Sequence, residues 1–144
     1  MKPRAVLDSS TVVSAIGWQG EARRILSLLA KRAFTSCTPA ALSEEWAEAV
    51  AMTAALPNWR NPNWATWLVW LRTVSVLAEA VPLRRTVKRD PKDDSVLAAA
   101  LGAGAAYLVS YDRDLLDLGK PFGIQCIHPR AFLIVLVSSL ASGG

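Results

Sequence analysis

The chain alternates between short apolar runs of strand length and longer stretches whose apolar residues recur with the period of an α-helix. Short runs of this kind are typical of strands in a parallel sheet, where both faces are covered. Strands that alternate with helices predict an α/β domain of three layers around a parallel sheet of four or five strands. The expected strands are 3–8, 33–37, 105–110 and 124–127, with 83–89 as an irregular segment or a short edge strand.

The expected helices are bounded by capping, proline and glycine signals. Stretch 21–32 places its apolar residues on one side and its charged residues on the other, as an amphipathic helix does. Asp90 and Pro91 are suited to the N-cap and the first helical position, and Gly102 and Gly104 end that helix. The expected helices are 9–15, 21–32, 39–55, 64 to about 80, 91–103 and 129–140.

Length and composition place broad limits on the protein. At 144 residues the chain is expected to form one domain, residues 1–141, with 142–144 as a tail. Lys and Arg exceed Asp and Glu by 16 to 12, a mild basic excess compatible with a polyanionic partner. Cys37 and Cys126 lack metal-ligand spacing, which favours reduced thiols in a cytoplasmic protein. The longest apolar run, 131–137, is too short to cross a membrane, so no membrane association is expected.

Four carboxylates are expected to converge although they lie far apart in the sequence. Asp8 ends the first strand, and Asp112 follows the strand 105–110. Glu45 lies early in a helix that follows a strand, and Asp94 lies early in a helix that precedes one. In a parallel sheet all four positions belong to the edge formed by the carboxyl ends of the strands, where ligands of such folds bind.

This convergence predicts a metal site. Four carboxylates in one cleft repel one another unless a cation holds them, and Asp94, on the apolar side of its helix, needs a partner for its charge. Oxygen ligands favour Mg²⁺ or Mn²⁺, whereas the lone His128 and the separated cysteines make zinc a poor fit. Such ions activate water and neutralise charge on phosphorus, so the expected reaction is hydrolysis of a phosphodiester.

Several motifs of the chain follow a known family pattern. Residues 6–15 are VLDSSTVVSA, 42–46 are LSEEW, 90–100 are DPKDDSVLAAA, 108–118 are LVSYDRDLLDL and 128–133 are HPRAFL. In this order they resemble the PIN-domain (PilT N-terminus) family, which includes VapC-like toxin ribonucleases of toxin–antitoxin pairs. The resemblance implies a Mg²⁺-dependent (or Mn²⁺-dependent) ribonuclease, a cognate antitoxin protein that silences it, and a homodimer.

The resemblance also implies roles for single residues. Asp8, Glu45, Asp94 and Asp112 are the implied catalytic acids; Asp8, Asp94 and Asp112 also bind metal, with Asp114 as a helper. Ser10 stands where the family usually has Asn, and Ser110-Tyr111 replaces Thr-Gly. A serine hydroxyl can still orient a water or a carboxylate, over a shorter reach. Ser10 and Ser110 are therefore expected to support the site.

Two of the acids have alternative interpretations. Asp8 stands where it would also cap the helix that follows it. Glu44 and Glu45 are adjacent, so one residue of register decides which is the second acid. Glu45 is favoured because it lies on the same helix face as Leu42 and Ala49.

A basic run and a group of tryptophans are candidates for binding surfaces. The basic run precedes Asp94 and is expected to guide RNA phosphates, with a solvated charge run as the alternative. The tryptophans suit core packing and an interface with a homodimer partner or antitoxin equally well, because Trp is favoured in interface hot spots. The RNA-contacting candidates are Arg84, Arg85, Lys88, Arg89 and Lys92, and the interface candidates are Trp59, Trp64, Trp67 and Trp70.

Two other functions compete with a metal-dependent ribonuclease. A phosphatase that uses Asp8 as nucleophile usually carries a second Asp two residues later, where this chain has Ser10. A non-catalytic PIN-like module would keep the fold for binding RNA or a protein. Metal affinity distinguishes the last case from the nuclease.

Overall fold

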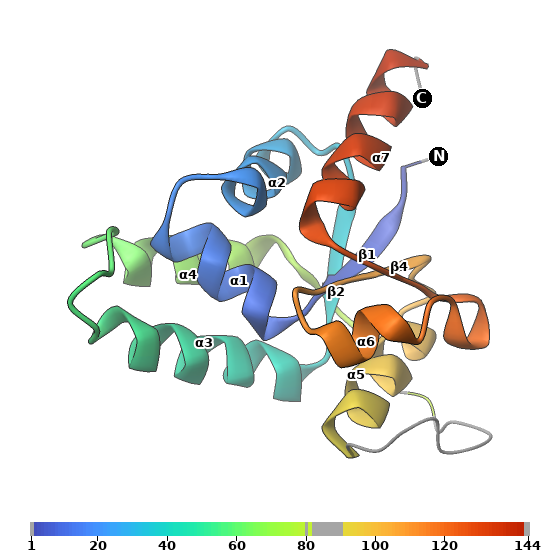
Figure 1. Cartoon of the computed structure of the whole chain (residues 1–144), viewed down its shortest axis with the longest axis horizontal. Coiled ribbons are helices and arrows are strands. Elements are labelled where there is room, and N and C mark those ends of the chain that lie inside the picture. The colour runs from blue at the N-terminus through green and yellow to red at the C-terminus, as the bar shows by residue number, and fades with distance from the viewer. Residues whose placement is uncertain (1, 80, 82–90, 143–144) are drawn as a thin grey trace.

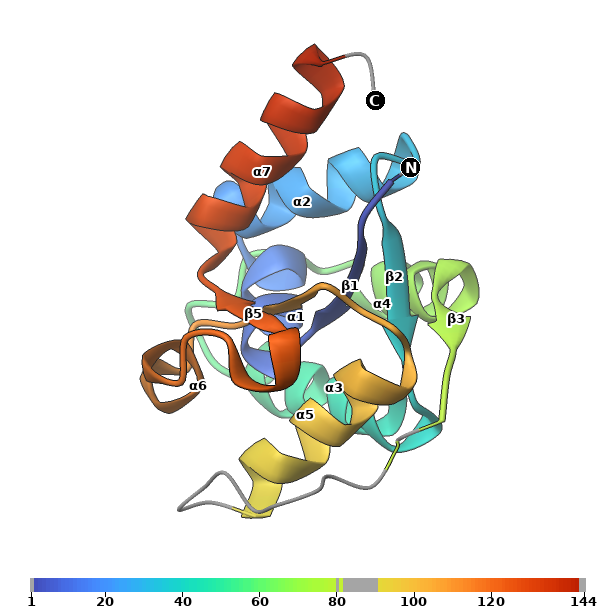
Figure 2. The same cartoon turned by 90° about the vertical axis from the view of Figure 1, so that its right-hand side faces the viewer.

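The computed structural model of the chain describes residues 2–79, 81 and 91–142, with the side chains of 91–94 excepted. Its sheet has five parallel strands in the order β3-β2-β1-β4-β5 (Figures 1 and 2). This arrangement confirms the predicted α/β fold with a central parallel sheet. The strands are β1 (Arg4–Leu7), β2 (Thr35–Thr38), β3 (Val76–Leu77), β4 (Tyr107–Val109) and β5 (Gln125–Ile127).

Helices cover both faces of the sheet. Helix α5 packs on β1, β2 and β4, whereas α1 packs against α2 and α3, and α2 packs against α7. In Figure 1 the strands run between α1 and α2 on one side and α5 on the other. The helices are α1 (Ser9–Gly17), α2 (Glu21–Ala30), α3 (Ala40–Ala54), α4 (Trp64–Val74), α5 (Pro91–Gly102), α6 (Arg113–Asp117) and α7 (Pro129–Ala141), with a 3₁₀ turn η1 (Pro121–Gly123).

The segment after the tryptophan-rich helix differs from its prediction. Helix α4 ends at Val74 rather than near residue 80, and the chain then forms the edge strand β3. Ser75 ends the helix: its buried hydroxyl lies 2.7 Å from the carbonyl oxygen of Leu71 and 2.8 Å from the hydroxyl of Ser36. This side chain ties the helix end to β2, so that the next two residues pair with β2. The expected edge segment 83–89 lies outside the described residues.

Two helix starts also differ in detail. Pro39 is the N-cap residue of α3 rather than its first helical residue, and the hydroxyl of Thr38 bonds the Pro39 carbonyl instead of a helix amide. The apolar pattern does not predict α6, because its five residues are too few to show a helical period. Asp112 caps this short helix, so the start of α6 depends on one of the candidate acids.

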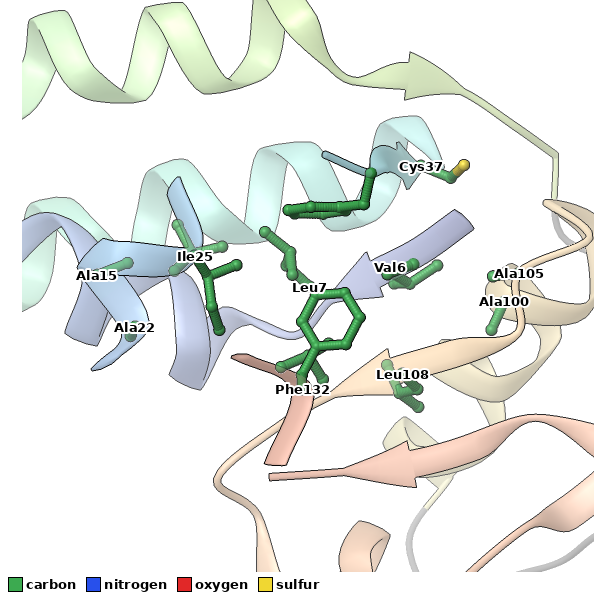
Figure 3. Close-up of a cluster of buried hydrophobic side chains, with 14 of the residues drawn as sticks. Val6, Leu7, Ala15, Ala22, Ile25, Cys37, Ala100, Ala105, Leu108 and Phe132 are labelled. Carbon is green, nitrogen blue, oxygen red and sulfur yellow. The ribbon is translucent and has the colours of Figure 1, made fainter. Parts of the chain in front are cut away.

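The core lies between the sheet and its helices. Figure 3 shows Leu7 of β1, Leu108 of β4, Ile25 of α2 and Phe132 of α7 as neighbouring side chains in it. The Phe132 ring packs edge-on against Phe34, with the ring centroids 5.2 Å apart. Both cysteines are buried, as expected of thiols in the core. None of the described helices is long and apolar enough to cross a membrane.

Candidate active site

Asp8 lies at the junction of β1 and α1, at the carboxyl edge of the sheet. The residue is 7% exposed, and its carboxylate oxygen Oδ1 accepts a 2.9 Å hydrogen bond from the amide of Ser9. Its own amide donates to the carbonyl of Val109, at 3.0 Å, which joins the ends of β1 and β4. Asp8 is therefore the N-cap of α1. The capping interpretation is correct, and it leaves Oδ2 for other partners.

Two serine hydroxyls connect the carboxylate to the turn that follows β4. Ser110 Oγ donates to Asp8 Oδ2 at 2.7 Å and accepts from the amide of Asp112 at 2.9 Å. Ser10 Oγ lies 3.3 Å from the same Asp8 oxygen and accepts from the amide of Tyr111 at 3.1 Å. These hydroxyls therefore fix the orientation of Asp8 and the path of the chain toward α6 together.

Glu45 reaches the same junction from α3. Ser9 Oγ donates to Glu45 Oε2 at 2.6 Å, whereas Glu44 is exposed, so the helix register turns Glu45 toward α1. The fully buried indole of Trp46 donates to the carbonyl of Leu7 at 2.9 Å. Glu45 is thus held against the start of α1 by Ser9, the residue that directly follows Asp8.

The electrostatics of Asp8 favour a cation. Burial raises the pKa of the Asp8 carboxyl, and the negative charge of Glu45 raises it further. Hydrogen bonds from Ser110, the Ser9 amide and Ser10 lower the pKa and oppose this effect only in part. A buried carboxylate beside a second one is stabilised in its charged form when a cation lies between them.

Asp112 and Asp114 are differently placed. Both are exposed, and Asp112 Oδ1 accepts from the amide of Asp114 at 2.9 Å as the N-cap of α6. Within residues 2–79, 81 and 95–142, no three His, Cys, Asp or Glu side chains form a group that could hold a metal ion. The donors around Asp8 are oxygens of the kind that Mg²⁺ prefers, but this part of the chain does not complete a ligand set.

The start of α5 lies beside Glu45. A small pocket of about 60 Å³ is lined by Leu42 and Glu45 of α3 and by Ser95 and Val96 of α5. Asp94 immediately precedes Ser95 in the first turn of α5, and its side chain lies outside the described residues. The topology therefore brings the backbone that carries the third acid to the second one.

The candidate RNA contacts lie outside the described residues as well. Arg84, Arg85, Lys88 and Arg89 belong to the segment that the structure does not describe, and only the backbone of Lys92, in α5, is described. Their proposed role therefore stays a prediction.

Two of the candidate tryptophans, Trp67 and Trp70, line a groove between α2 and α4. Trp59, Trp64, Trp67 and Trp70 are all half-buried and pack in part against the core, and Arg23 lies 4.4 Å above the Trp67 ring. A hollow of about 410 Å³ and a neighbouring one of about 510 Å³ share Ala30 and Trp70. We call this pair of hollows the α2–α4 groove; its walls are Leu26, Ser27, Ala30, Thr66, Trp67 and Trp70, and then Lys2, Leu29, Arg32, Phe34, Thr35, Ser36, Val74 and Val76.

These features identify the class of protein. Residues 4–114 match the PIN domain family, so the chain belongs to that family, whose members are generally nucleases that use divalent metal ions. The fold is similar to that in the crystal structure of PAE2754 from Pyrobaculum aerophilum, with a TM-score of 0.63. That similarity covers 96% of this chain and 99% of the other at 22% identity, and it concerns the fold alone. None of the curated proteins matches this chain.

The sequence does not indicate two residues that position the candidate acids, Ser9 and Trp46. Ser9 bonds Glu45, and Trp46 bonds the carbonyl that precedes Asp8. Their only sequence signal is adjacency to a candidate acid, and adjacency does not say where a side chain points. Ser10 and Ser110, in contrast, stand where the family pattern places supporting polar groups, and both contact Asp8.

Proposed function

We propose that this chain is a ribonuclease that hydrolyses RNA phosphodiester bonds with a divalent ion, Mg²⁺ or Mn²⁺. The observation that carries the proposal is the buried Asp8 carboxylate, whose pKa is raised by burial and by Glu45 at the carboxyl edge of the sheet. A carboxylate pair in this state is an incomplete cation site. The protein places it where α/β folds bind their ligands.

The proposed ligands of the ion are Asp8, Asp94 and Asp112, with Asp114 as a helper and Glu45 as the fourth catalytic acid. When bound, the ion lowers the pKa of a water and neutralises charge on the phosphate. Ser110 and Ser10 hold Asp8 Oδ2 in one orientation. Glu45 lines a small pocket beside the start of α5, and we propose that it exchanges a proton with water there.

The test is cleavage of single-stranded and structured RNA by purified protein, with Mg²⁺, with Mn²⁺ and with a chelator. Metal-dependent cleavage that Asp94→Asn abolishes, with unfolding temperature unchanged, is the expected result. Cleavage that persists in the Asp94→Asn variant would refute the role of that acid, and cleavage that persists in chelator would refute the metal.

RNA affinity provides a separate measurement. We propose that the basic run Arg84, Arg85, Lys88, Arg89 and Lys92 contacts phosphates. The affinity for RNA without metal should then fall steeply as salt rises, because phosphate contacts release counterions. An affinity indifferent to salt would exclude this role.

A non-catalytic RNA-binding or protein-binding module is the second candidate. One observation favours it: Asp112, a proposed ligand of the ion, is exposed and caps α6. It predicts RNA affinity without metal affinity, which calorimetry with Mg²⁺ and Mn²⁺ measures directly. The phosphatase alternative has less support, because Ser10, in the place of its second acid, is bonded to Asp8.

We further propose that the chain is the toxin of a toxin–antitoxin pair and that the antitoxin occupies the α2–α4 groove. The hollow at Trp67 is apolar, the neighbouring hollow is lined by polar and apolar residues, and the charged residues of its wall, Lys2 and Arg32, are both cations. An antitoxin segment with apolar and acidic residues complements such walls, whereas a second copy of the chain would bring like charges together. The proposed homodimer therefore uses another face.

Substitution in the groove tests this assignment. Trp70→Ala should weaken capture of a co-expressed antitoxin by roughly 30-fold or more, the effect of losing a hot-spot tryptophan. Val137→Ala, an exposed apolar position on α7, is the matched control. A loss of dimer rather than of antitoxin binding in Trp70→Ala would assign the groove to the second copy instead.

A further inference from the structure

The edge of the sheet continues beyond the carboxylates. Asp8, Ser110 and His128 directly follow the ends of the neighbouring strands β1, β4 and β5. The amide of Asp8 donates to the carbonyl of Val109, and the amide of Ser110 donates to the carbonyl of Ile127, so these ends are held in register. Adjacent strands lie about 5 Å apart, so the end of β5 lies about 10 Å from the end of β1. A strand of RNA bound at Asp8 can therefore extend along this edge.

Two aromatic rings, those of Tyr111 and His128, lie along this edge of the sheet. Tyr111 and His128 pack edge to face, with ring centroids 4.9 Å apart and ring planes at 86°. Both are half-buried, so part of each side chain remains open to solvent.

Both rings are held in place by polar contacts. The amide of Tyr111 donates to Ser10 Oγ, the hydroxyl that also contacts Asp8, so the backbone that carries the Tyr111 ring is fixed beside the carboxylate. His128 Nδ1 accepts from the amide of Arg130 at 3.0 Å and caps α7. A ring that is already fixed loses little conformational freedom when a ligand stacks on it.

Exposed cations lie within two residues of each ring along the chain. The Arg130 side chain is 74% exposed, and its contact with Glu21 is long, at 3.6 Å. Arg113, which follows Asp112, is exposed as well. Single-stranded nucleic acid is bound without sequence preference by aromatic rings on which bases stack, beside cations that follow the backbone.

We infer that Tyr111 and His128 form a nucleobase-stacking subsite for single-stranded RNA next to the carboxylates. The inference rests on the proposed ribonuclease function and adds the form of its substrate: an unpaired nucleotide beside the bond that is cut. A base paired in a duplex has its faces covered by its neighbours, so the subsite selects unpaired RNA.

Binding is measured with a fluorescent single-stranded oligoribonucleotide in chelator, so that affinity is separated from cleavage. Tyr111→Leu keeps an apolar side chain but removes the ring, and Tyr111→Phe keeps the ring but removes the phenol. His128→Asn keeps an N-cap acceptor for the Arg130 amide. Tyr107→Leu removes a half-buried tyrosine ring from the opposite end of the same strand, and it serves as the matched control.

Tyr111→Leu and His128→Asn should each weaken binding by roughly 5- to 150-fold, the range for losing one stacked base. Tyr111→Phe and Tyr107→Leu should bind within about twofold of the wild type, a change smaller than any stacking contribution. A set of oligonucleotides with one abasic nucleotide each then locates the stacked base. One abasic position should weaken binding to the wild type and weaken binding to Tyr111→Leu by a smaller factor.

The outcomes separate this subsite from the proposed function. If the wild type cleaves RNA and Tyr111→Leu and His128→Asn bind it equally well, the subsite is refuted and the nuclease stands. If the wild type neither binds nor cleaves RNA, both fail. Thermal unfolding of each variant accompanies the binding data. Should Tyr111→Leu not fold, His128→Asn and the abasic series on the wild type decide the question.

Discussion

Asp8 and Asp112 occupy equivalent places on neighbouring strands and yet differ in almost every physical respect. Each follows a strand, β1 or β4, and each is the N-cap of the next helix, α1 or α6. Asp8 is buried, accepts hydrogen bonds at both oxygens and has a raised pKa. Asp112 is exposed, and its side chain accepts the capping bond from the amide of Asp114.

The difference separates two duties that one residue type can perform at a strand end. Capping is sufficient to explain Asp112, because an exposed aspartate at an N-cap is stable without a cation. Capping does not explain the burial of Asp8, since a buried carboxylate is costly unless further groups stabilise its charge. Ser110, which bonds Asp8 and the amide of Asp112, is the physical link between the two.

The largest expected effect is on catalysis at Asp8. Asp8→Asn should lower cleavage of single-stranded RNA by about 10³-fold or more, because it removes the carboxylate that is proposed to hold the ion. Asp112→Asn keeps a good N-cap and should lower cleavage less. Cleavage rates in saturating Mg²⁺ measure both. Equal losses in the two variants would show that the difference in burial has no functional meaning.

A smaller effect is expected at Ser110, which serves both carboxylates. Ser110→Ala leaves Asp8 Oδ2 without its closest donor and the amide of Asp112 without its acceptor. The free energy of unfolding should fall by about 1–3 kcal/mol, the usual cost of a buried polar group left unsatisfied. Urea unfolding measures this change. Ser110→Thr keeps the hydroxyl and is the control; if both variants lose stability equally, packing rather than hydrogen bonding explains the effect.

The positions of these strand ends are predictable from the sequence, whereas their surroundings are not. Asp8, Glu45 and the start of α5 meet because parallel strands share one carboxyl edge, and the order of strands and helices is enough to deduce it. Whether Asp112 faces Asp8 or its own helix depends on a side-chain rotamer, which no hydrophobic pattern encodes. The contact between Ser9 and Glu45 likewise depends on how two helices are oriented.

Short or exposed elements also escape the pattern. Strand β3 has two residues, Val76 and Leu77, and both are exposed, so no alternation marks it as part of the sheet. Helix α6, with five residues, is likewise too short to show a helical period in the sequence. The half-burial of the tryptophans on α4 could be anticipated only as a pair of alternatives, because a stripe of large apolar residues suits a core and an interface equally well.

The smallest expected effect is the pH dependence of stability that the state of Asp8 creates. Because the pKa of Asp8 is raised in the folded protein, the folded state binds this proton more tightly than the unfolded state does. The contribution of Asp8 to the free energy of unfolding is then fully present below its unfolded pKa and is lost as the pH rises through its folded pKa.

Without metal, the Asp8→Asn variant should therefore gain stability relative to the wild type as the pH rises from about 3.5 toward 7. The hydrogen bond that this variant loses changes the stability difference by the same amount at every pH. Urea unfolding at several pH values in chelator measures the slope, and Mg²⁺ at pH 7 should stabilise the wild type alone. If the stability difference between Asp8→Asn and the wild type does not change with pH, or if Mg²⁺ stabilises both proteins equally, the burial of Asp8 is unrelated to metal binding.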